Sequence, residues 1–576
     1  MKTFLDWSAY KDAGMGDAYA DIPRHGGDFA KAVAVCINSR QCEAEGKQVM
    51  CPSFRVSGNE HLSTGGRVRL LKAALNSELA EQALADPALA EAMDLCVACK
   101  GCKRECEANV DMPLIKAEYL AQRAARQGLG WRSRLFGHTP RWLHRAPWLK
   151  PLVHWRNASP LLARLSERLF GLAANRALPE PAAKPFATAP ANATPTAGLP
   201  EVVLLVDTFT RHFEPGIAEA ALAVLEAGGY RVLIAESEGS DSEPARALCC
   251  GRTYLAQGMI DEARTEARRL VQALLPHVQA GRTVVGLEAS CVLGLRDDAQ
   301  ALGLGAAVEQ VAKHCLLFEE FLAREATAKR LDLPLKALAG SETLVHGHCH
   351  QKAVGAMKSM RRVLKLIPDH EFSLIESGCC GMAGTFGIEA EHAEMSAKMA
   401  EQALMPALRE NPQHGWWPTA SPAATRCAPM ATSGRGIWPS CCAMRWRKRP
   451  TEAIRTALRR VGSGEALPTG ARAPRSGLAG ADLAAHRRLL AQGEPVVAAG
   501  RAVQAQAAAE EAQQVDRAER LVAQAEAGLE RVEVGRLDIR DDPPYALLHI
   551  ALQRPVHADG VQALAAIQGL VSPLYM

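Results

Sequence analysis

The stretch Cys96-Val-Ala-Cys-Lys-Gly-Cys-Lys-Arg-Glu-Cys106 places four cysteines at a spacing of two, two and three intervening residues. In bacterial iron–sulfur proteins, three thiolates of such a run hold one 4Fe-4S cubane and the fourth reaches a neighbouring cluster. The small residues Ala98 and Gly101 allow backbone N–H groups to approach the cluster sulfurs. Closely spaced cysteines also bind zinc, but this run, with a further cysteine group upstream, exceeds what one tetrahedral ion requires. The stretch therefore predicts an iron–sulfur site.

A second cysteine group precedes this run and is incomplete on the same template, because Ser39 stands where a thiolate is expected. An exchange of fourth ligands, as in two-cluster ferredoxins, predicts two ligand sets. The first is Cys96, Cys99 and Cys102 with Cys51 (or Cys106) as fourth ligand, and the second is Cys36, Cys42 and Cys106. Three thiolates suit a 3Fe-4S cluster, or a 4Fe-4S cluster completed by Ser39 or another ligand. The alternative is a single cubane, with Cys36 and Cys42 as ordinary buried residues.

The composition is that of a multidomain globular protein. The 576 residues are 48% hydrophobic and 23% charged, and 17 of them are cysteines that lie in clusters. A net charge of +4 gives no reason to expect a nucleic-acid partner. Asp6, Lys11 and Asp12 interrupt any signal-peptide core, and no apolar run approaches the roughly 20 residues of a spanning helix. We therefore expect a cytoplasmic protein with metal or redox chemistry rather than a disulfide framework.

The chain divides into five predicted parts. These are an α-helical two-cluster ferredoxin-like domain (30–125), a Trp- and Arg-rich helical connector (126–177), a Pro- and Ala-rich linker (178–200), a cysteine-rich α/β domain (201–415) and an anomalous tail (416–576). Within the first part, an apolar stripe at helical spacing from Leu70 to Leu84 predicts a helix between the two cysteine groups. The amphipathic Trp and Arg residues of the connector suit an anionic membrane surface or a partner protein, or pack the domains together.

The α/β domain shows a strand–helix–strand pattern: a strand at 202–206, a helix at 215–227 and a strand at 231–235. Strand-like segments at 284–287 and 343–345 each run into a cysteine loop. The pattern predicts that this domain is duplicated, with one half at 201–300 and the other at 340–415.

Each predicted half contains two adjacent cysteines followed by glycine. Neighbouring side chains of extended backbone point to opposite faces, so tandem cysteines seldom serve packing, whereas a loop that binds a cluster can use both. Glycine after the pair permits a positive φ or a close backbone approach. The candidate residues are Cys249, Cys250 and Cys291 in the first half, and Cys349, Cys379 and Cys380 with His348 and His350 in the second.

These motifs resemble a known family. Met50–Arg55, His61–Arg67 and Leu95–Cys106 are similar to the iron–sulfur part of FAD-linked 2-hydroxy-acid dehydrogenases, the glycolate oxidase and D-2-hydroxyglutarate dehydrogenase-like group. Gly347–Lys352 and Gly378–Gly387 resemble the CCG cysteine-rich domains of heterodisulfide reductase and of glycolate oxidase iron–sulfur subunits. Two positions depart from the pattern: Glu107 replaces the usual proline, and Asp207-Thr208-Phe209 replaces an early cysteine of the first half.

The resemblance implies an electron-transfer protein that relays electrons from a flavin-dependent 2-hydroxy-acid dehydrogenase subunit to a quinone or another acceptor. It also implies an additional iron–sulfur or redox-thiol centre in one CCG half. Because no convincing Gly-rich nucleotide fingerprint is present, we expect FAD only on a partner chain. The sequence also leaves open a peripheral contact with the inner face of the membrane. The alternatives are a disulfide reductase that uses the CCG centre, and an inactive, degenerate paralogue.

The sequence of the tail indicates that the reading frame has shifted near Trp416. In the second half a cysteine is due near position 421, 41 positions after Cys380, as Cys291 follows Cys250; the residue present is Ser421. Tryptophan has a single codon, TGG, so moving the frame back one base across Trp416-Trp417-Pro418 forces Val and Ala. The next residues then permit Asp-Gly-Gln-Pro-Cys-Arg-His-Gln-Met, with cysteine in the slot of Pro422. The alternative is a divergent carboxy-terminal extension.

Overall fold

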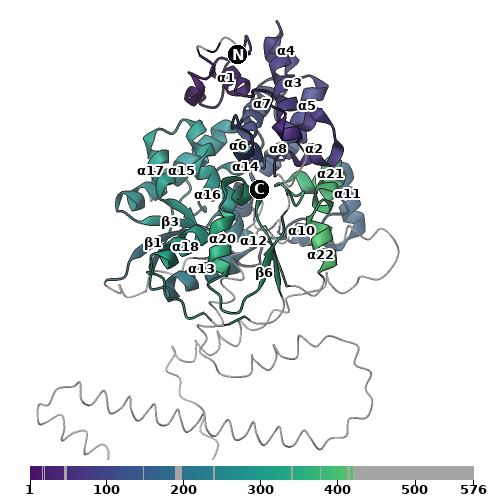
Figure 1. The fold of residues 1–576 in the computed structure, drawn as a ribbon. Coiled ribbons are helices and arrows are strands. Elements are labelled where there is room, and N and C mark those ends of the chain that lie inside the picture. Colours follow the sequence, from purple (N-terminus) through teal and green to yellow (C-terminus); the bar gives the residue numbers. More distant parts are fainter. Residues whose placement is uncertain are drawn as a thin grey trace, which may run out of the picture. The chain divides into compact units, whose positions relative to one another are not determined.

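The computed structural model describes residues 1–411 and the backbone of 415–418. Gaps within this part are 16, 18–19, 45–48, 147, 149, 188–197, 238–240, 336, 339–341, 377 and 412–414. The predicted tail beyond position 418 lies outside the described residues, so its packing is not tested. Figure 1 shows that helices predominate and that the few strands are short.

The amino-terminal part is helical. Its helices are α1 (Asp28–Ala34), α2 (Pro52–Ser57), α3 (Thr64–Asn76), α4 (Ala80–Ala83), α5 (Pro87–Asp94), α6 (Gly101–Glu105) and α7 (Met112–Gln127). Ser63 caps α3, because its hydroxyl accepts the backbone N–H of Gly66 at 2.8 Å. The apolar stripe from Leu70 to Leu84, predicted as one helix, forms two helices, α3 and α4. The break follows Asn76, where the Ser77 hydroxyl accepts the N–H of Leu79 and competes with helical hydrogen bonding.

Four helices form the predicted connector: α8 (Trp131–Gly137), α9 (Thr139–Arg145), α10 (Lys150–Ala158) and α11 (Pro160–Phe170). The buried guanidinium of Arg156 donates to the carbonyl oxygens of Ala173 and Arg176, which ties α10 to the segment after α11. Part of the predicted linker is also ordered: Phe186 is buried, and its N–H donates to Arg211 O at 2.8 Å. The linker thus packs on the following domain near Phe186.

The first sheet is parallel with strand order β2-β1-β3-β4. Its strands are β1 (Glu201–Leu205), β2 (Arg231–Ile234), β3 (Thr283–Gly286) and β4 (Cys315–Leu317). Its helices are α12 (Thr208–Phe213), α13 (Pro215–Ala227), α14 (Arg252–Leu255), α15 (Ile260–Gln279), α16 (Ala289–Arg296), α17 (Ala306–His314) and α18 (Phe318–Thr327). Cys315 lies buried at the start of strand β4.

The second sheet is parallel with strand order β6-β5-β7. Its strands are β5 (Thr343–His346), β6 (Phe372–Leu374) and β7 (Gly415–Pro418). The helices of this part are α19 (Cys349–Val354), α20 (Met357–Leu364), α21 (Ala393–Glu401) and α22 (Leu404–Glu410). In both sheets the first strand in the chain lies between the second and the third.

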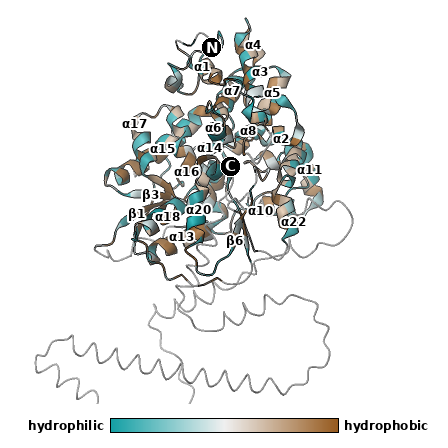
Figure 2. Ribbon diagram, viewed as in Figure 1, coloured by the Kyte–Doolittle hydropathy of each residue, from teal (hydrophilic) through white to brown (hydrophobic). Residues whose placement is uncertain are grey.

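The helices carry alternating hydrophobic and hydrophilic stretches (Figure 2), as expected of helices packed on one face. One continuous apolar core joins the amino-terminal helices to the first sheet, and includes Leu75, Ile115, Val203 and Leu274. The two parts are therefore packed as one body. Within the described residues, no helix is both long and apolar enough to cross a membrane.

Candidate iron–sulfur and thiol sites

Four thiols of the first predicted ligand set surround one small cavity, which is lined by Cys51, Cys96, Cys99 and Cys102. Cys51 and two residues between the cysteines, Ala98 and Lys100, have positive φ values of 55°, 48° and 63°. Non-glycine residues adopt this conformation at a cost of about 1–3 kcal/mol, and such residues gather at functional sites. The loop is thus bent so that its thiols face one space.

The segment before Cys51 packs closely against the Cys96–Cys106 run, and this explains why position 101 is a glycine. A Cβ atom at this position would lie 2.8 Å from the backbone nitrogen of Met50. The Glu105 carboxylate also accepts the backbone N–H groups of Val49 and Met50, at 2.9 and 2.8 Å. Gly101 therefore admits the segment before Cys51, whereas the sequence suggested only that it exposes N–H groups to a cluster.

The amino terminus of α3 faces one cysteine of each predicted ligand set, Cys51 of the first and Cys42 of the second. The backbone N–H of Thr64 donates to Sγ of Cys51 at 3.1 Å, and that of Gly65 donates to Sγ of Cys42 at 3.3 Å. Such donors and the positive end of the helix dipole favour thiolates over thiols. Sequence analysis missed these two residues as functional, although they lie within the His61–Arg67 motif that carries the resemblance.

Burial opposes ionisation of the same thiols in the absence of a metal. It raises the pKa of Cys51 to about 11, and it also raises the pKa of Cys99 and of Cys102. Electrostatic repulsion between the sulfurs also raises the pKa of Cys102. The neighbouring thiols responsible are Cys99, Cys51 and Cys96. The cations of a cluster would offset both effects, which makes the donor set suited to a bound iron–sulfur group.

The second predicted set also comes together. Burial raises the pKa of Cys36, and so do the neighbouring thiols of Cys106 and Cys42. Cys42 is buried, whereas Cys36 and Cys106 are half-buried. The three thiols thus share one environment, and none of them lines the small cavity beside Cys51.

The spacing of the thiols does not suit a single zinc ion. A tetrahedral zinc with sulfurs at about 2.3 Å holds them about 3.8 Å apart. In the described part of the chain, ligand atoms of three residues within 4.8 Å of one another occur only in two groups without cysteine, Glu389/Glu391/His392 and Asp111/Asp297/Asp298. A cubane, which is larger than one ion, therefore fits these thiols better.

The cysteines of the second CCG half line a separate cavity of about 420 Å³. Cys349 begins α19, and the tandem pair Cys379 and Cys380 approaches from the loop after β6. Hydrogen bonds from Cys379 and His346 lower the pKa of the Cys380 thiol. His346, which sequence analysis did not select, therefore lies beside this thiol.

The two predicted histidine ligands already have partners. Nδ1 of His348 accepts the backbone N–H of His350 at 3.1 Å and so caps α19. Nε2 of His350 lies 3.1 Å from the carbonyl oxygen of Ala98 and 3.2 Å from Nη2 of Arg252. Metal ligation by either ring would have to replace these contacts.

Both cysteine systems meet at the same cavity. Its lining includes Cys96 and Cys99 from the amino-terminal run and Cys349, Cys379 and Cys380 from the second half. The Cys349 thiol is close enough to Cys99 to raise the pKa of Cys99, after the larger effect of burial.

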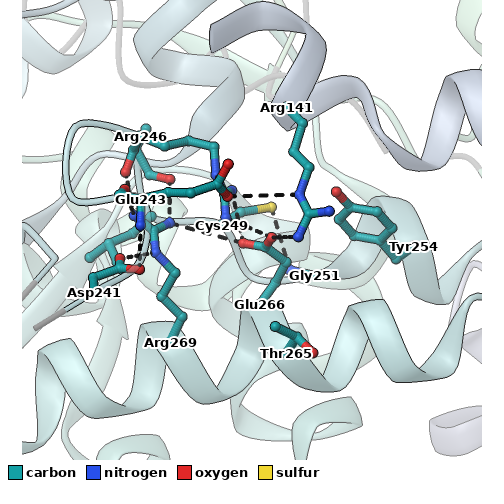
Figure 3. A network of polar contacts seen from close by, with 12 residues as sticks. Arg141, Asp241, Glu243, Arg246, Cys249, Gly251, Tyr254, Thr265, Glu266 and Arg269 are labelled. Atoms are coloured by element: carbon teal, nitrogen blue, oxygen red, sulfur yellow. Dashed lines mark hydrogen bonds and ion pairs between the residues drawn. The ribbon is translucent and has the colours of Figure 1, made fainter. Parts of the chain in front are cut away.

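In the first half, the Cys250 thiol contacts both of the other cysteines. Sγ of Cys250 lies 3.0 Å from Sγ of Cys291, and Sγ of Cys249 accepts the backbone N–H of Gly251 at 3.4 Å. Figure 3 shows the neighbouring ion network, in which Glu266 of α15 lies between Arg246 and Arg141. This network holds the loop that carries the tandem cysteines.

Comparisons with known proteins agree with the motifs. Residues 32–110 match the family model of the 4Fe-4S dicluster domain, and residues 343–413 match that of the cysteine-rich CCG domain. No solved structure matches the chain.

The curated relatives are dehydrogenase proteins. The chain is 28% identical over 193 residues to one of the subunits of anaerobic glycerol-3-phosphate dehydrogenase of Escherichia coli, a match that covers 33% of this chain and 46% of that protein. It is 24% identical over 339 residues to D-2-hydroxyglutarate dehydrogenase of Escherichia coli, and 27% over 340 residues to that of Pseudomonas putida. These matches cover 56% and 54% of this chain, but only 31% and 30% of the relatives. The chain thus spans less than half the length of these relatives. It carries a 4Fe-4S dicluster domain followed by a cysteine-rich CCG domain, and its resemblance to the iron–sulfur part of FAD-linked dehydrogenases is confirmed.

Proposed function

We propose that the chain relays electrons from a flavin-dependent 2-hydroxy-acid dehydrogenase partner, which carries the FAD, to a quinone or another acceptor. The observation that carries this proposal is the shared cavity: thiols of the amino-terminal run and of the second CCG half line the same 420 Å³ space. Electron transfer between centres requires that they lie close together, and this arrangement provides two adjacent donor sets. An iron–sulfur group accepts and releases single electrons when it is bound.

Three sets of cysteines are the proposed ligands of three separate redox centres. Cys51, Cys96, Cys99 and Cys102 are the proposed ligands of a 4Fe-4S cluster. Cys36, Cys42 and Cys106 are the proposed ligands of a second cluster, either 3Fe-4S or 4Fe-4S with a non-thiolate ligand. Cys349, Cys379 and Cys380 are the proposed ligands of the CCG centre, with His348 and His350 as nearby nitrogen donors.

The protein residues around the first set exclude water and supply fixed charge. Arg67 is fully buried and donates to the Ala92 carbonyl and the Ser53 hydroxyl, so its charge remains near Cys51. The buried Lys100 ammonium contacts Asp111 at 3.2 Å and Asp297 at 2.8 Å. Positive charge near a cluster favours its reduced state, so the Arg67 guanidinium acts in this direction, whereas the charge of Lys100 is offset by Asp111, Asp297 and Asp298.

The matching strand order supports the proposed duplication of the CCG domain. Order β2-β1-β3 in the first sheet corresponds to β6-β5-β7 in the second. In each half the tandem cysteines and glycine follow the second strand, and Gly251 and Gly381 have the same φ of 81°. Duplication accounts for both features at once.

The connector is the proposed docking region for a partner or a membrane surface. Its exposed large apolar residues, among those described, are Trp131, Leu135, Trp142, Trp148, Leu152, Trp155, Leu161, Leu162, Leu165, Leu169 and Phe170. In α11 the usual arrangement is reversed, because the leucines face solvent while Ala163 and Ser166 are buried. Large apolar side chains in such a group mark an interaction surface.

A disulfide reductase is the second candidate. The lowered pKa of Cys380 favours a thiolate, which is the nucleophile in thiol–disulfide exchange, and Cys380 lines the cavity. The two functions differ in product: a reductase converts a disulfide to thiols, whereas a relay reduces a quinone and leaves disulfides unchanged.

The deciding experiment uses the full chain, purified without oxygen and analysed for iron, acid-labile sulfide and electron paramagnetic resonance. After reduction with dithionite and removal of excess reductant, a water-soluble quinone or a small disulfide is added. We expect reoxidation of the clusters by quinone at a rate that the Cys349→Ala variant lowers. Reoxidation by disulfide alone would favour the reductase, and absence of iron and sulfide would favour the degenerate paralogue.

A further inference from the structure

In the first CCG half, the Cys250 thiol contacts those of Cys291 and Cys249, and the half has one cysteine fewer than a four-thiol ligand set. Sγ of Cys250 and Sγ of Cys291 are 3.0 Å apart, closer than two sulfurs at van der Waals contact. Cys250 comes from the loop before α14, and Cys291 from the first turn of α16. They are 41 positions apart in sequence, so the fold creates this pairing.

Asp207 stands where an early cysteine of this half is expected, and its carboxylate already accepts hydrogen bonds from the chain. One carboxylate oxygen of Asp207 accepts the N–H groups of Phe209 and Thr210, at 2.8 and 3.1 Å, and the other accepts the hydroxyl of Thr210 at 2.5 Å. Asp207 thus caps α12. Within the described residues, no three ligand atoms drawn from Cys249, Cys250, Cys291 and Asp207 lie within 4.8 Å of one another. This separation does not suit a single metal ion, and because Asp207 caps α12 in place of the early cysteine, the half also lacks the fourth thiol of a cluster set.

The surroundings keep the loop with the tandem cysteines in position. Arg246 and Glu266 form two buried hydrogen bonds of 2.9 and 2.8 Å (Figure 3). Arg269 also donates to the Ala247 carbonyl at 2.8 Å. A Cβ atom at Gly251 would lie 2.6 Å from the Ala263 carbonyl oxygen, so the loop packs directly on α15. A loop held in this way keeps Cys250 in a fixed position beside Cys291.

We propose that Cys250 and Cys291 form a reversible intramolecular disulfide, and that they do not ligate iron. Cys250 is half-buried and Cys291 is buried, which makes Cys250 the thiol that an external disulfide meets first. Attack by the Cys250 sulfur on a low-molecular-weight disulfide gives a mixed disulfide and releases one thiol. Attack by Cys291 then closes the Cys250–Cys291 bond and releases the second thiol. The pair loses two electrons and two protons, and the external disulfide gains both.

The test uses the full chain with its clusters, incubated with glutathione disulfide under anaerobic conditions, alkylated and digested with trypsin. Cleavage after Arg246, Arg252, Arg282 and Arg296 isolates the two cysteine-containing peptides. We expect one linked product whose mass is two hydrogens below the sum of the peptides, and its loss in Cys250→Ser and Cys291→Ser. Cys249→Ser should retain the link, which distinguishes the two adjacent cysteines. Cys315→Ser, which removes a buried strand cysteine, is the matched control.

Iron content decides between a disulfide and a cluster. The proposal requires unchanged iron and sulfide in Cys291→Ser, and a thermal unfolding midpoint within the range of the control establishes that this variant is folded. If that variant is unfolded, the linked peptide in the unaltered protein still tests the pair. Absence of the linked peptide, or loss of iron in folded Cys291→Ser, would overturn the proposal. Neither result depends on the relay function, which concerns the other cysteines.

Discussion

Nε2 of His350 lies 3.1 Å from the carbonyl oxygen of Ala98, a residue 252 positions earlier in the chain. Ala98 lies between two proposed ligands of the amino-terminal cluster, and His350 follows a proposed ligand of the CCG centre. This contact joins the two loops directly. The loops that carry the two sets of proposed ligands are therefore packed against each other at this point.

Replacing Cys99 by Ala removes one of the four thiols that line the small cavity. We expect loss of one cubane signal in electron paramagnetic resonance and a lower iron content, because three thiols cannot complete the proposed set. Cys315→Ala, which alters a buried cysteine of strand β4, should leave both unchanged. Unchanged iron in Cys99→Ala would show that the assignment of this set is wrong.

Replacing Gly101 by Ala tests how closely the two cysteine segments pack. The added Cβ atom would lie 2.8 Å from the backbone nitrogen and 2.9 Å from Cα of Met50, so the segments have to separate. We expect a loss of about 1–3 kcal/mol of stability, typical of overpacking, together with a more labile cluster. Gly130→Ala is the control, since nothing lies within 4 Å of its Cβ. Thermal unfolding and iron retention measure both effects, and equal behaviour of the two variants would contradict the packing argument.

His392 links the CCG part to α5 and predicts a pH dependence. It lies 2.9 Å from Asp94 and 3.1 Å from Glu389, and these acids raise its pKa to about 9, against the opposing effect of burial. Because the folded value exceeds the ordinary value of 6.5, the contribution to stability is complete below about pH 6.5 and is lost as the pH rises through about 9.

His392→Gln should therefore lower the unfolding midpoint most at pH 6 and least at pH 10. The loss is on the order of 1–2 kcal/mol, reduced by the solvent exposure of Asp94. His314→Gln, at an exposed histidine of α17, serves as the control. Equal destabilisation at both pH values would contradict the ion-pair explanation.

The exposed leucines of α11 test the docking region. Leu161, Leu165 and Leu169 lie four residues apart on one face and are 75%, 50% and 57% exposed. Burying a leucine contributes about 1.5–3 kcal/mol, so replacing all three by Ser should abolish co-sedimentation with anionic vesicles at low salt. Val354→Ser, at another exposed apolar residue, is the control. Sedimentation that the triple variant does not change would count against membrane contact and leave a partner protein as the occupant.

Local patterns predicted the elements that local physics determines. The helix expected at 215–227 is α13 at the same bounds, and the apolar runs near Val203 and Val284 are strands β1 and β3. The cysteine motifs predicted which distant thiols come together, but distant contacts outside these motifs were not predictable, because no local pattern specifies them. The backbone N–H groups of Thr64 and Gly65 reach thiols only when α3 packs against Cys51 and Cys42, and the contact between Cys250 and Cys291 exists only in the folded chain.

The proposed frameshift has a structural counterpart in strand β7. Gly286 of β3 pairs with the end of β1, and Pro418 of β7 pairs with the end of β5, so the two residues hold matching positions. Cys291 follows Gly286 by five positions, and the shifted frame places a cysteine in the slot of Pro422, four positions after Pro418. The match to the cysteine-rich family model also ends at residue 413, just before the proposed shift.

If the frame is shifted, the second half lacks one thiol, and its centre should lose iron more readily than the amino-terminal clusters. A gene with the frame restored after Gly415 should yield a protein with more iron per chain that resists chelation longer. Replacing the restored cysteine by Ser provides the control, because it alters only that ligand. The coding DNA gives the first answer: a minus-one frame that does not read Cys-Arg-His-Gln at this point would make the divergent extension the correct explanation.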